Sequence, residues 1–215
     1  MKTVAIVLSG CGVLDGSEIH EAVITLNAVE NCGAKAAFFA PNIAQLDVVD
    51  HLTGKTLCEK RNVLTESARI ARGACTDLSK YSPEDFSALI FVGGFGAAKT
   101  LCNFAITGEN CTVNPCVAAA IDKNLSAKKP IGFLCISPVI AARHIANGVK
   151  ITVGNNAATA KAIQAMGATH INCEVSSFVF DEKFNVYSTP AYMLAKNTVQ
   201  LAAGVNAMVK AMLNA

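Results

Sequence analysis

The sequence has no tryptophan, few aromatic residues (6%) and few charged residues (16%). Its net charge of +2 is spread along the chain without a basic run, so it lacks the electrostatic pattern of a nucleic-acid or anionic-membrane binder. No uninterrupted apolar run reaches membrane-spanning length. These absences predict a soluble protein that acts on a small molecule or another protein.

The nine cysteines include no Cys-x-x-Cys pair, and their number is odd. This pattern argues against a disulfide framework and a zinc site, so we expect reduced thiols and no bound metal. The first residues lead directly into a strand-like run and leave no room for a secretory signal, although a removed targeting peptide would leave no trace. We therefore expect a cytoplasmic protein.

Short apolar runs rich in β-branched and aromatic residues alternate with helical patterns along the chain. The predicted strands are 3–9, 36–40, 88–92, 131–134 and 149–153, followed by a hairpin of 178–180 and 186–188. The predicted helices are 17–32, 62–72, 114–126, 157–166 and 191–213. Such alternation is typical of an α/β fold with a parallel sheet, and the length and 52% hydrophobic content suit one domain over 1–215. The hydrophobic residues of 47–60 follow neither the helical nor the strand period, so this segment is expected to form a hairpin or a surface excursion.

Cys135 lies between the apolar run 131–134 and a helical stretch that follows Pro138. At such a corner the strand brings the side chain to the rim of the sheet, and the unpaired N–H groups of the helix start can stabilise a thiolate. The position therefore favours a nucleophile. The alternative is a buried core residue, which is the commonest role of a free cysteine.

Two other loops follow strands at the same sheet edge, where ligands of parallel sheets bind. The first begins with Gly10 and Cys11 and leads to Glu18 and Glu21, three residues apart on one helix face. Cys11 is a candidate second reactive thiol. Either glutamate could serve the site, while the other caps the helix.

The second loop, Gly93-Gly94-Phe95-Gly96, allows close approach of backbone N–H groups and could form an oxyanion hole. It matches neither the dinucleotide fingerprint nor the P-loop, which disfavours phosphate binding. Lys99, just beyond it, is expected to form a local salt bridge in preference to attracting an anionic substrate.

Several motifs resemble the ElbB family of glyoxalase-like proteins, in the ThiJ/PfpI superfamily related to class I glutamine amidotransferases. The motifs are Gly10-Cys11-Gly12, Asp15-Gly16-Ser17-Glu18-Ile19-His20-Glu21-Ala22, Gly93-Gly94-Phe95-Gly96-Ala97-Ala98-Lys99, Glu109-Asn110-Cys111-Thr112-Val113 and Thr189-Pro190-Ala191-Tyr192-Met193-Leu194-Ala195. The resemblance implies a flavodoxin-like three-layer sandwich, with helices on both faces of a mostly parallel sheet, and a homodimer.

The resemblance also implies Cys135 as nucleophile, Glu21 as a protonated acid with Glu18 as the runner-up, and Gly94 as oxyanion donor. The expected substrate-binding residues are Gly10, Cys11, Glu18, Gly93 and Ile136.

The chain lacks a histidine at the positions where members of the superfamily have a histidine base. Ile136 follows the cysteine, residues 152–155 contain no histidine, and no glycines flank Cys135 at a spacing of two. Peptide and glutamine hydrolysis are therefore disfavoured. A thiol can still add to an aldehyde, and a glutamate of raised pKa can move a proton between adjacent carbons.

This chemistry predicts a cofactor-independent enzyme that converts methylglyoxal or glyoxal to a 2-hydroxy acid. We expect burial to raise the pKa of the glutamate and the helix start to lower that of Cys135. The alternatives are a non-catalytic thiol stress sensor and an amidotransferase-like partner in a biosynthetic complex. His20 is expected at a surface or interface, and Tyr192 in the pocket or the core.

Overall fold

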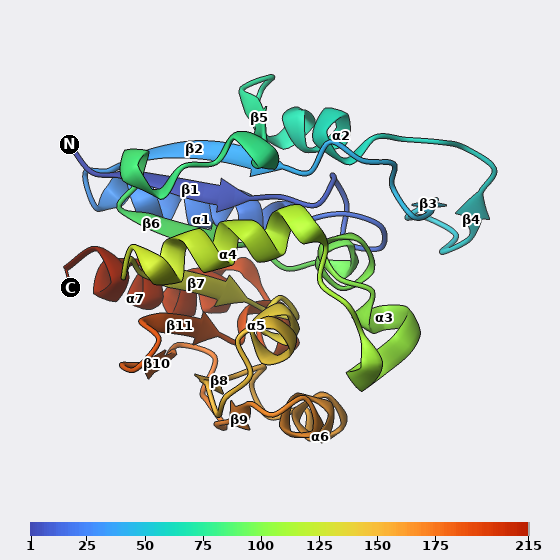
Figure 1. The fold of residues 1–215 in the computed structure, drawn as a ribbon. Helices are drawn as coiled ribbons and strands as arrows, with labels where there is room; N and C mark the ends of the chain where they lie inside the picture. Colours follow the sequence, from blue (N-terminus) through green and yellow to red (C-terminus); the bar gives the residue numbers. More distant parts are fainter. Residues whose placement is uncertain (215) are drawn as a thin grey trace.

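The computed structural model describes residues 1–214 and consists of a central sheet between two layers of helices (Figure 1). The sheet has seven strands in the order β10-β11-β7-β6-β1-β2-β5, and all pairs are parallel except β10 with β11. The strands are β1 (Thr3–Val7), β2 (Lys35–Ala40), β5 (Cys75–Asp77), β6 (Ala88–Phe91), β7 (Ile131–Leu134), β10 (Val179–Asp181) and β11 (Val186–Thr189). This order confirms the predicted flavodoxin-like α/β fold.

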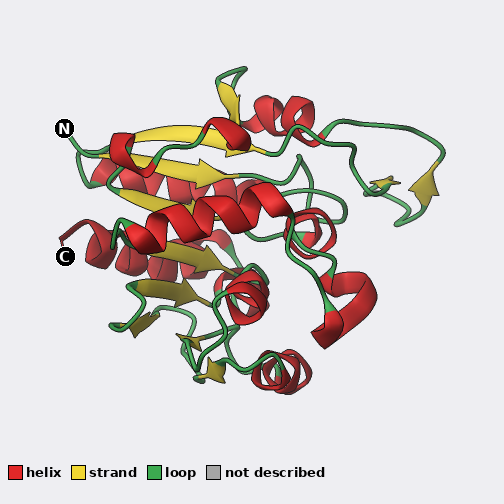
Figure 2. Cartoon of the chain, viewed as in Figure 1, coloured by secondary structure: helices red, strands yellow, loops and turns green. Residues whose placement is uncertain are grey.

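Helices cover both faces of the sheet (Figure 2). One face packs against α1 (Ile19–Asn31), α2 (Val63–Ile70) and α7 (Thr198–Asn214), and the other against α4 (Pro115–Ser126) and α5 (Pro138–His144), with α6 (Ala157–Ala165) on α5. All four residues of β6 and of β7 are buried because both faces are covered, which explains their continuous apolar sequence. No helix among residues 1–214 combines the length and the apolar character needed to span a bilayer.

Local signals fixed several helix ends. Asn62 caps α2, since its side chain accepts a hydrogen bond from the Thr65 N–H at 3.1 Å. Gly33 follows α1 with φ +71°, the left-handed conformation expected after a helix. The predicted start of α1 at residue 17 was two residues too early, because Glu18 is the cap and the Ser17 hydroxyl instead accepts from the Ser9 N–H at 2.8 Å.

Two predicted elements differ from the structure. The last helix begins at Thr198 because the side chain of Asn197 caps it through the Gln200 N–H, while Ala191–Met193 form a 3-10 turn. The strand predicted at 149–153 is the short β8 (Lys150–Ile151), which pairs with β9 (Thr169–His170) outside the central sheet. The π-helix Ala97–Leu101 and the short α3 (Phe104–Thr107) were not predicted, because neither is long enough to show a period.

Residues 47–60 form a hairpin that projects beyond the carboxyl edge of the sheet (Figure 1). Its strands are β3 (Val48–Val49) and β4 (Thr56–Leu57). The Asp15 carboxylate accepts a hydrogen bond from the Val49 N–H at 2.7 Å, and Lys99 forms an ion pair with Asp47 at 2.7 Å. The hairpin is therefore tied to the loops that follow β1 and β6.

Candidate active site

The candidate site lies at the carboxyl ends of β1, β6 and β7. The chain reverses its strand order between β1 and β6, and this reversal leaves a crevice where ligands of open parallel sheets bind. The segments after these three strands carry Glu21, in the first turn of α1, and Gly93 and Cys135, which lie in loops. Residues far apart in the sequence therefore converge there.

Cys135 occupies a strained turn between β7 and α5. Its φ of +60° is unusual for a residue with a side chain, and it is only 9% exposed. Its N–H donates to the Thr189 carbonyl at 3.1 Å. The Ser137 hydroxyl stabilises this turn. It accepts a hydrogen bond from the Leu134 N–H at 2.9 Å and donates one to the Phe91 carbonyl at 2.9 Å. These bonds hold the thiol at the sheet edge despite the unfavourable backbone angle.

Glu21 is fully buried beside this thiol. One carboxyl oxygen accepts from the Gly93 N–H at 3.1 Å and the other from the Tyr192 N–H at 3.3 Å. The carboxyl is also within hydrogen-bonding reach of the Cys135 thiol. Glu18 has a different position, because its carboxylate accepts from the Glu21 N–H at 2.7 Å and caps α1. The structure thus brings Glu21 to the thiol and leaves Glu18 at the helix start.

The glycines after β6 permit this close approach. A Cβ at Gly93 would lie 2.5 Å from both the Cys135 Cβ and a Glu21 carboxyl oxygen. Gly94 has φ +94°, and a Cβ there would lie 2.4 Å from the Glu18 nitrogen. The N–H groups of Gly94 and Ile136 are close enough to the Cys135 thiol to lower its pKa. Two backbone donors therefore surround the position where negative charge would develop.

Burial changes the acidity of both groups. It raises the pKa of Glu21 from an ordinary 4.5 to about 7, with a smaller contribution from the Glu18 charge. Burial also raises the pKa of Cys135, and the neighbouring Glu21 carboxylate raises it further. The expected lowering of the thiol pKa is therefore wrong, since the Gly94 and Ile136 N–H groups do not outweigh desolvation. At neutral pH the thiol keeps its proton, and a partly ionised carboxylate lies beside it.

A cavity of about 380 Å³ opens onto the thiol. It is lined by Val13, Glu18, Gly94, Phe95, Cys135, Ile136, Thr159, Tyr192 and Met193. Most of these residues are apolar, and no lysine or arginine is among the lining residues. Lys99 instead pairs with Asp47 and donates to the Leu14 carbonyl at 3.0 Å, so it has the local structural role that was predicted.

Some expected substrate-binding residues lie elsewhere. Gly10, Cys11 and Gly93 are absent from the cavity lining, whereas Glu18 and Ile136 are among the lining residues. The Gly10 N–H donates to the Ser67 hydroxyl at 2.9 Å, so the start of the loop after β1 lies against α2. Burial raises the pKa of Cys11, as it does that of Cys135.

Sequence reasoning missed four of the nine residues of the cavity wall. Val13, Phe95, Thr159 and Met193 have no reactive side chain that would indicate a site, and only their tertiary positions place them together. Tyr192, which was left between pocket and core, lines the cavity. Its hydroxyl lies 3.0 Å from Nδ1 of His20, a residue on the exposed surface as expected.

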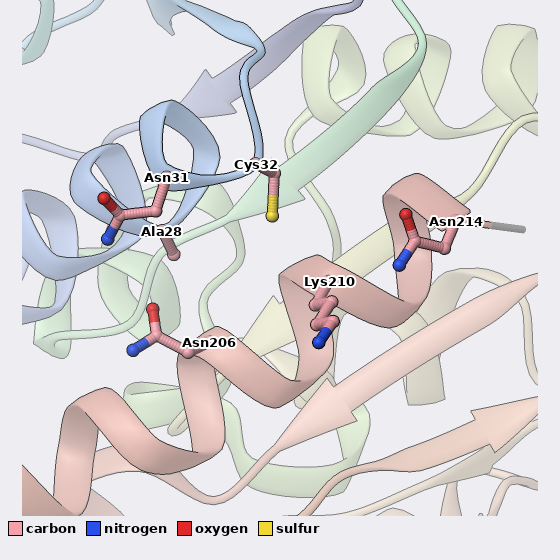
Figure 3. Close-up of a pocket in the computed structure, with 6 residues that line it drawn as sticks. All are labelled: Ala28, Asn31, Cys32, Asn206, Lys210 and Asn214. Atoms are coloured by element: carbon pink, nitrogen blue, oxygen red, sulfur yellow. The ribbon is translucent and has the colours of Figure 1, made fainter.

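A second hollow, of about 370 Å³, lies between the ends of α1 and α7 (Figure 3). Cys32 and Lys210 are among its lining residues. Its nearest lining residue on α1, Ala28, is seven residues beyond Glu21, which is about 10 Å at a rise of 1.5 Å per residue, and the hollow shares no lining residue with the Cys135 cavity. It is therefore not part of the Cys135 site.

Among residues 1–214 there is no group of three or more histidine, cysteine, aspartate or glutamate side chains arranged to hold a metal ion. The described histidines lie in separate places. His144 pairs with Asp122 at 2.7 Å, and His51 lies 3.0 Å from the Val49 carbonyl.

The doubly wound sheet and the buried cysteine at a strand-to-helix turn define a flavodoxin-like protein of the amidotransferase type. No protein-family model matches the chain. The chain is 46% identical over 220 residues to the human glutamine amidotransferase-like class 1 domain-containing protein 3, mitochondrial, covering 98% of this chain and 82% of that protein. The chain therefore belongs to the glutamine amidotransferase-like class 1 domain family.

Solved structures agree with this assignment. The isoprenoid biosynthesis protein with amidotransferase-like domain from Ehrlichia chaffeensis is 36% identical, with a TM-score of 0.92 over 99% of both chains. Drosophila melanogaster DJ-1beta shares the fold at 16% identity, with a TM-score of 0.54 over 99% of this chain and 96% of that chain.

The human relative is named as a mitochondrial protein, which contradicts the predicted cytoplasmic location. That prediction rested on the unpaired cysteines and on the lack of room for a secretory signal before the first predicted strand. Free thiols exclude oxidising compartments only, so they do not distinguish one reducing compartment from another.

Proposed function

We propose that the protein is a single-domain, cofactor-independent glyoxalase-like enzyme of the ElbB type that converts small 2-oxoaldehydes to 2-hydroxy acids. The observation that carries this proposal is the buried Glu21 carboxyl against the Cys135 thiol, below a small and mainly apolar cavity. Glu18 is the only charged residue in the lining, so a neutral substrate such as methylglyoxal or glyoxal fits better than an anion.

Glu21 begins the reaction as a base. The thiol proton passes to the Glu21 carboxylate while sulfur bonds to the aldehyde carbon, and the Gly94 and Ile136 N–H groups stabilise the resulting oxyanion. Return of the proton to this oxygen gives a neutral hemithioacetal. A thiol with a raised pKa suits this sequence, because its proton leaves only as the bond to carbon forms.

The same carboxylate then moves a hydrogen between carbons. It removes the proton from the former aldehyde carbon and delivers it to the neighbouring carbonyl carbon. The hydroxyl proton of the hemithioacetal passes to the oxygen on that neighbouring carbon, which leaves a thioester of the 2-hydroxy acid on Cys135. The pKa of about 7 for Glu21 suits both steps, since it makes the group an effective acid and base near neutral pH. Water then hydrolyses the thioester.

Consumption of methylglyoxal and formation of lactate test the proposal. We expect Cys135→Ala and Glu21→Gln to abolish turnover with folding intact, whereas Cys32→Ser, at an exposed cysteine outside the cavity, retains it. Turnover by Cys135→Ala would eliminate the covalent route. Turnover by Glu21→Gln would remove the carboxylate from the mechanism.

The two alternative functions have less support. A thiol sensor needs a readily ionised thiol, whereas burial and Glu21 raise the pKa of Cys135. An amidotransferase partner must hold the charged groups of glutamine, but the cavity lining provides no cation for its carboxylate. Sulfinate formation without turnover would favour the sensor, and release of ammonia from glutamine would favour the amidotransferase.

The oligomeric state is a further part of the proposal. The resemblance to the ElbB family implies a homodimer, and sedimentation equilibrium of the purified chain would measure the mass of the assembly.

A further inference from the structure

A chain of polar contacts lies at the mouth of the Cys135 cavity. Nδ1 of His20 lies 3.0 Å from the Tyr192 hydroxyl and 3.7 Å from a carboxylate oxygen of Glu18. Glu18 and Tyr192 both line the cavity, whereas the His20 side chain is 60% exposed. Groups that can transfer protons therefore connect the cavity with solvent.

The same residues that contact His20 also contact Glu21, the carboxyl beside the thiol. One Glu18 oxygen caps α1 through the Glu21 N–H at 2.7 Å, and the other is the oxygen near His20. The Tyr192 N–H donates to Glu21 at 3.3 Å, while its hydroxyl reaches His20. Glu21 and His20 are thus positioned by the same two residues, one inside the site and one at its entrance.

Thioester hydrolysis needs a group that takes a proton from the attacking water. The chain has no histidine at residue 136 or within 152–155, so the base must come from elsewhere. Glu21 has no exposed surface, and both its oxygens accept backbone hydrogen bonds. Tyr192 lines the cavity, and its hydroxyl contacts the exposed His20.

We propose that Tyr192 and His20 form a proton relay that activates water to hydrolyse the acyl-Cys135 intermediate, with Glu18 stabilising the cation formed at His20. This inference rests on the proposed glyoxalase-like function. The group that finally takes the proton, His20, lies on α1 and not in the loops that follow β7 and β8.

A water proton passes to the Tyr192 oxygen as the Tyr192 hydroxyl proton passes to Nδ1 of His20, and the water oxygen bonds to the thioester carbon. The C–S bond then breaks, and its electron pair goes to the Cys135 sulfur. The new carboxylic acid gives its proton to that sulfur and leaves as the carboxylate. His20 releases its proton to solvent, so one thioester and one water yield one carboxylate, one thiol and one proton.

Rapid mixing with methylglyoxal, followed by intact-mass spectrometry, tests the relay. His20→Asn keeps a polar group near Tyr192 but cannot accept a proton, and Tyr192→Phe removes the hydroxyl. We expect both variants to form the lactoyl adduct at the wild-type rate and to release lactate about 100-fold more slowly, the loss typical of a general base. The double variant should be no slower than either single one, because the two groups act together.

His144→Asn is the matched control, since His144 contacts Asp122 and is absent from the cavity lining. It should behave as wild type. Equal slowing of adduct formation and release in His20→Asn and Tyr192→Phe would overturn the relay, because it would show a structural role. Wild-type rates in both variants would also overturn it. A wild-type protein that forms neither adduct nor lactate would overturn the proposed function and the relay with it.

Discussion

Replacing Glu21 by glutamine should change how the stability of the protein depends on pH. The Glu21 side chain has no exposed surface, and burial raises its pKa from an ordinary 4.5 to about 7. A raised pKa in the folded state means that the folded protein holds a proton which the unfolded chain has lost. The stabilisation is therefore complete below pH 4.5, declines as the pH rises, and is lost once the pH passes about 7.

The size of the effect follows from the same two values. A tenfold change in a proton-binding constant corresponds to about 1.4 kcal/mol, so the move from 4.5 to about 7 corresponds to roughly 3 kcal/mol. We expect the wild type to lose about this much stability between pH 5 and pH 8 because of Glu21. Glutamine carries no charge at either pH, so Glu21→Gln should lack this loss.

Urea unfolding at the two pH values measures the difference. The comparison should use the pH-dependent change and not the absolute stability, because glutamine can accept only one of the hydrogen bonds that Gly93 and Tyr192 donate, at a cost of about 1 kcal/mol. Glu30→Gln is the control, since Glu30 is exposed on the same helix. It should leave the wild-type pH dependence unchanged.

If the free energy of unfolding changed with pH by the same amount in wild type and in Glu21→Gln, the reasoning would be refuted. This result would mean that the carboxylate is stabilised in the folded state as well as in water, and that Glu21 cannot act as an acid and base of pKa near 7.

Four further predictions concern the site and its surroundings. Gly93→Ala should lower turnover about 100-fold and destabilise the fold by about 1–3 kcal/mol, because its Cβ would lie 2.5 Å from both Cys135 and Glu21; steady-state kinetics and urea unfolding measure the two effects. In wild type, kcat/KM should rise with pH through about 7 as Glu21 ionises, and Glu18→Gln should shift this midpoint to lower pH because the Glu18 charge contributes to the raised pKa. Cys11→Ser should keep full turnover, since Cys11 is not in the cavity lining, and a large loss would restore the second-thiol hypothesis. Lys99→Met should cost about 1 kcal/mol and speed proteolysis within 50–60, since the half-buried Lys99–Asp47 pair anchors the hairpin; unchanged cleavage would show that the pair is dispensable.

The central strands and most helices were predictable from the sequence. Strands such as β6 are buried on both faces, so their residues are apolar without interruption. Helix ends depend on adjacent residues, as with the Asn62 cap and Gly33. Where several short turns follow one another, as between 97 and 113, no period is long enough to read.

Candidate site residues were predictable to different degrees. Cys135 was indicated by its place between a strand and a helix, both local features. Glu18 and Glu21 lie three residues apart on one helix face, so the pattern left both as candidates. The structure places Glu21 beneath Gly93, which is 72 residues away, and leaves Glu18 at the helix cap.

The sequence by itself determined the order of strands and helices, the turn that carries Cys135 and the glycine loop opposite it, because each depends on neighbours along the chain. The tertiary structure alone decided that Glu21 contacts the thiol, that Cys11 is absent from the cavity lining, and that Tyr192 joins Glu21 to His20. It also decided that the thiol pKa is raised and not lowered. Desolvation depends on every segment that covers a group, and those segments meet only when the chain is folded.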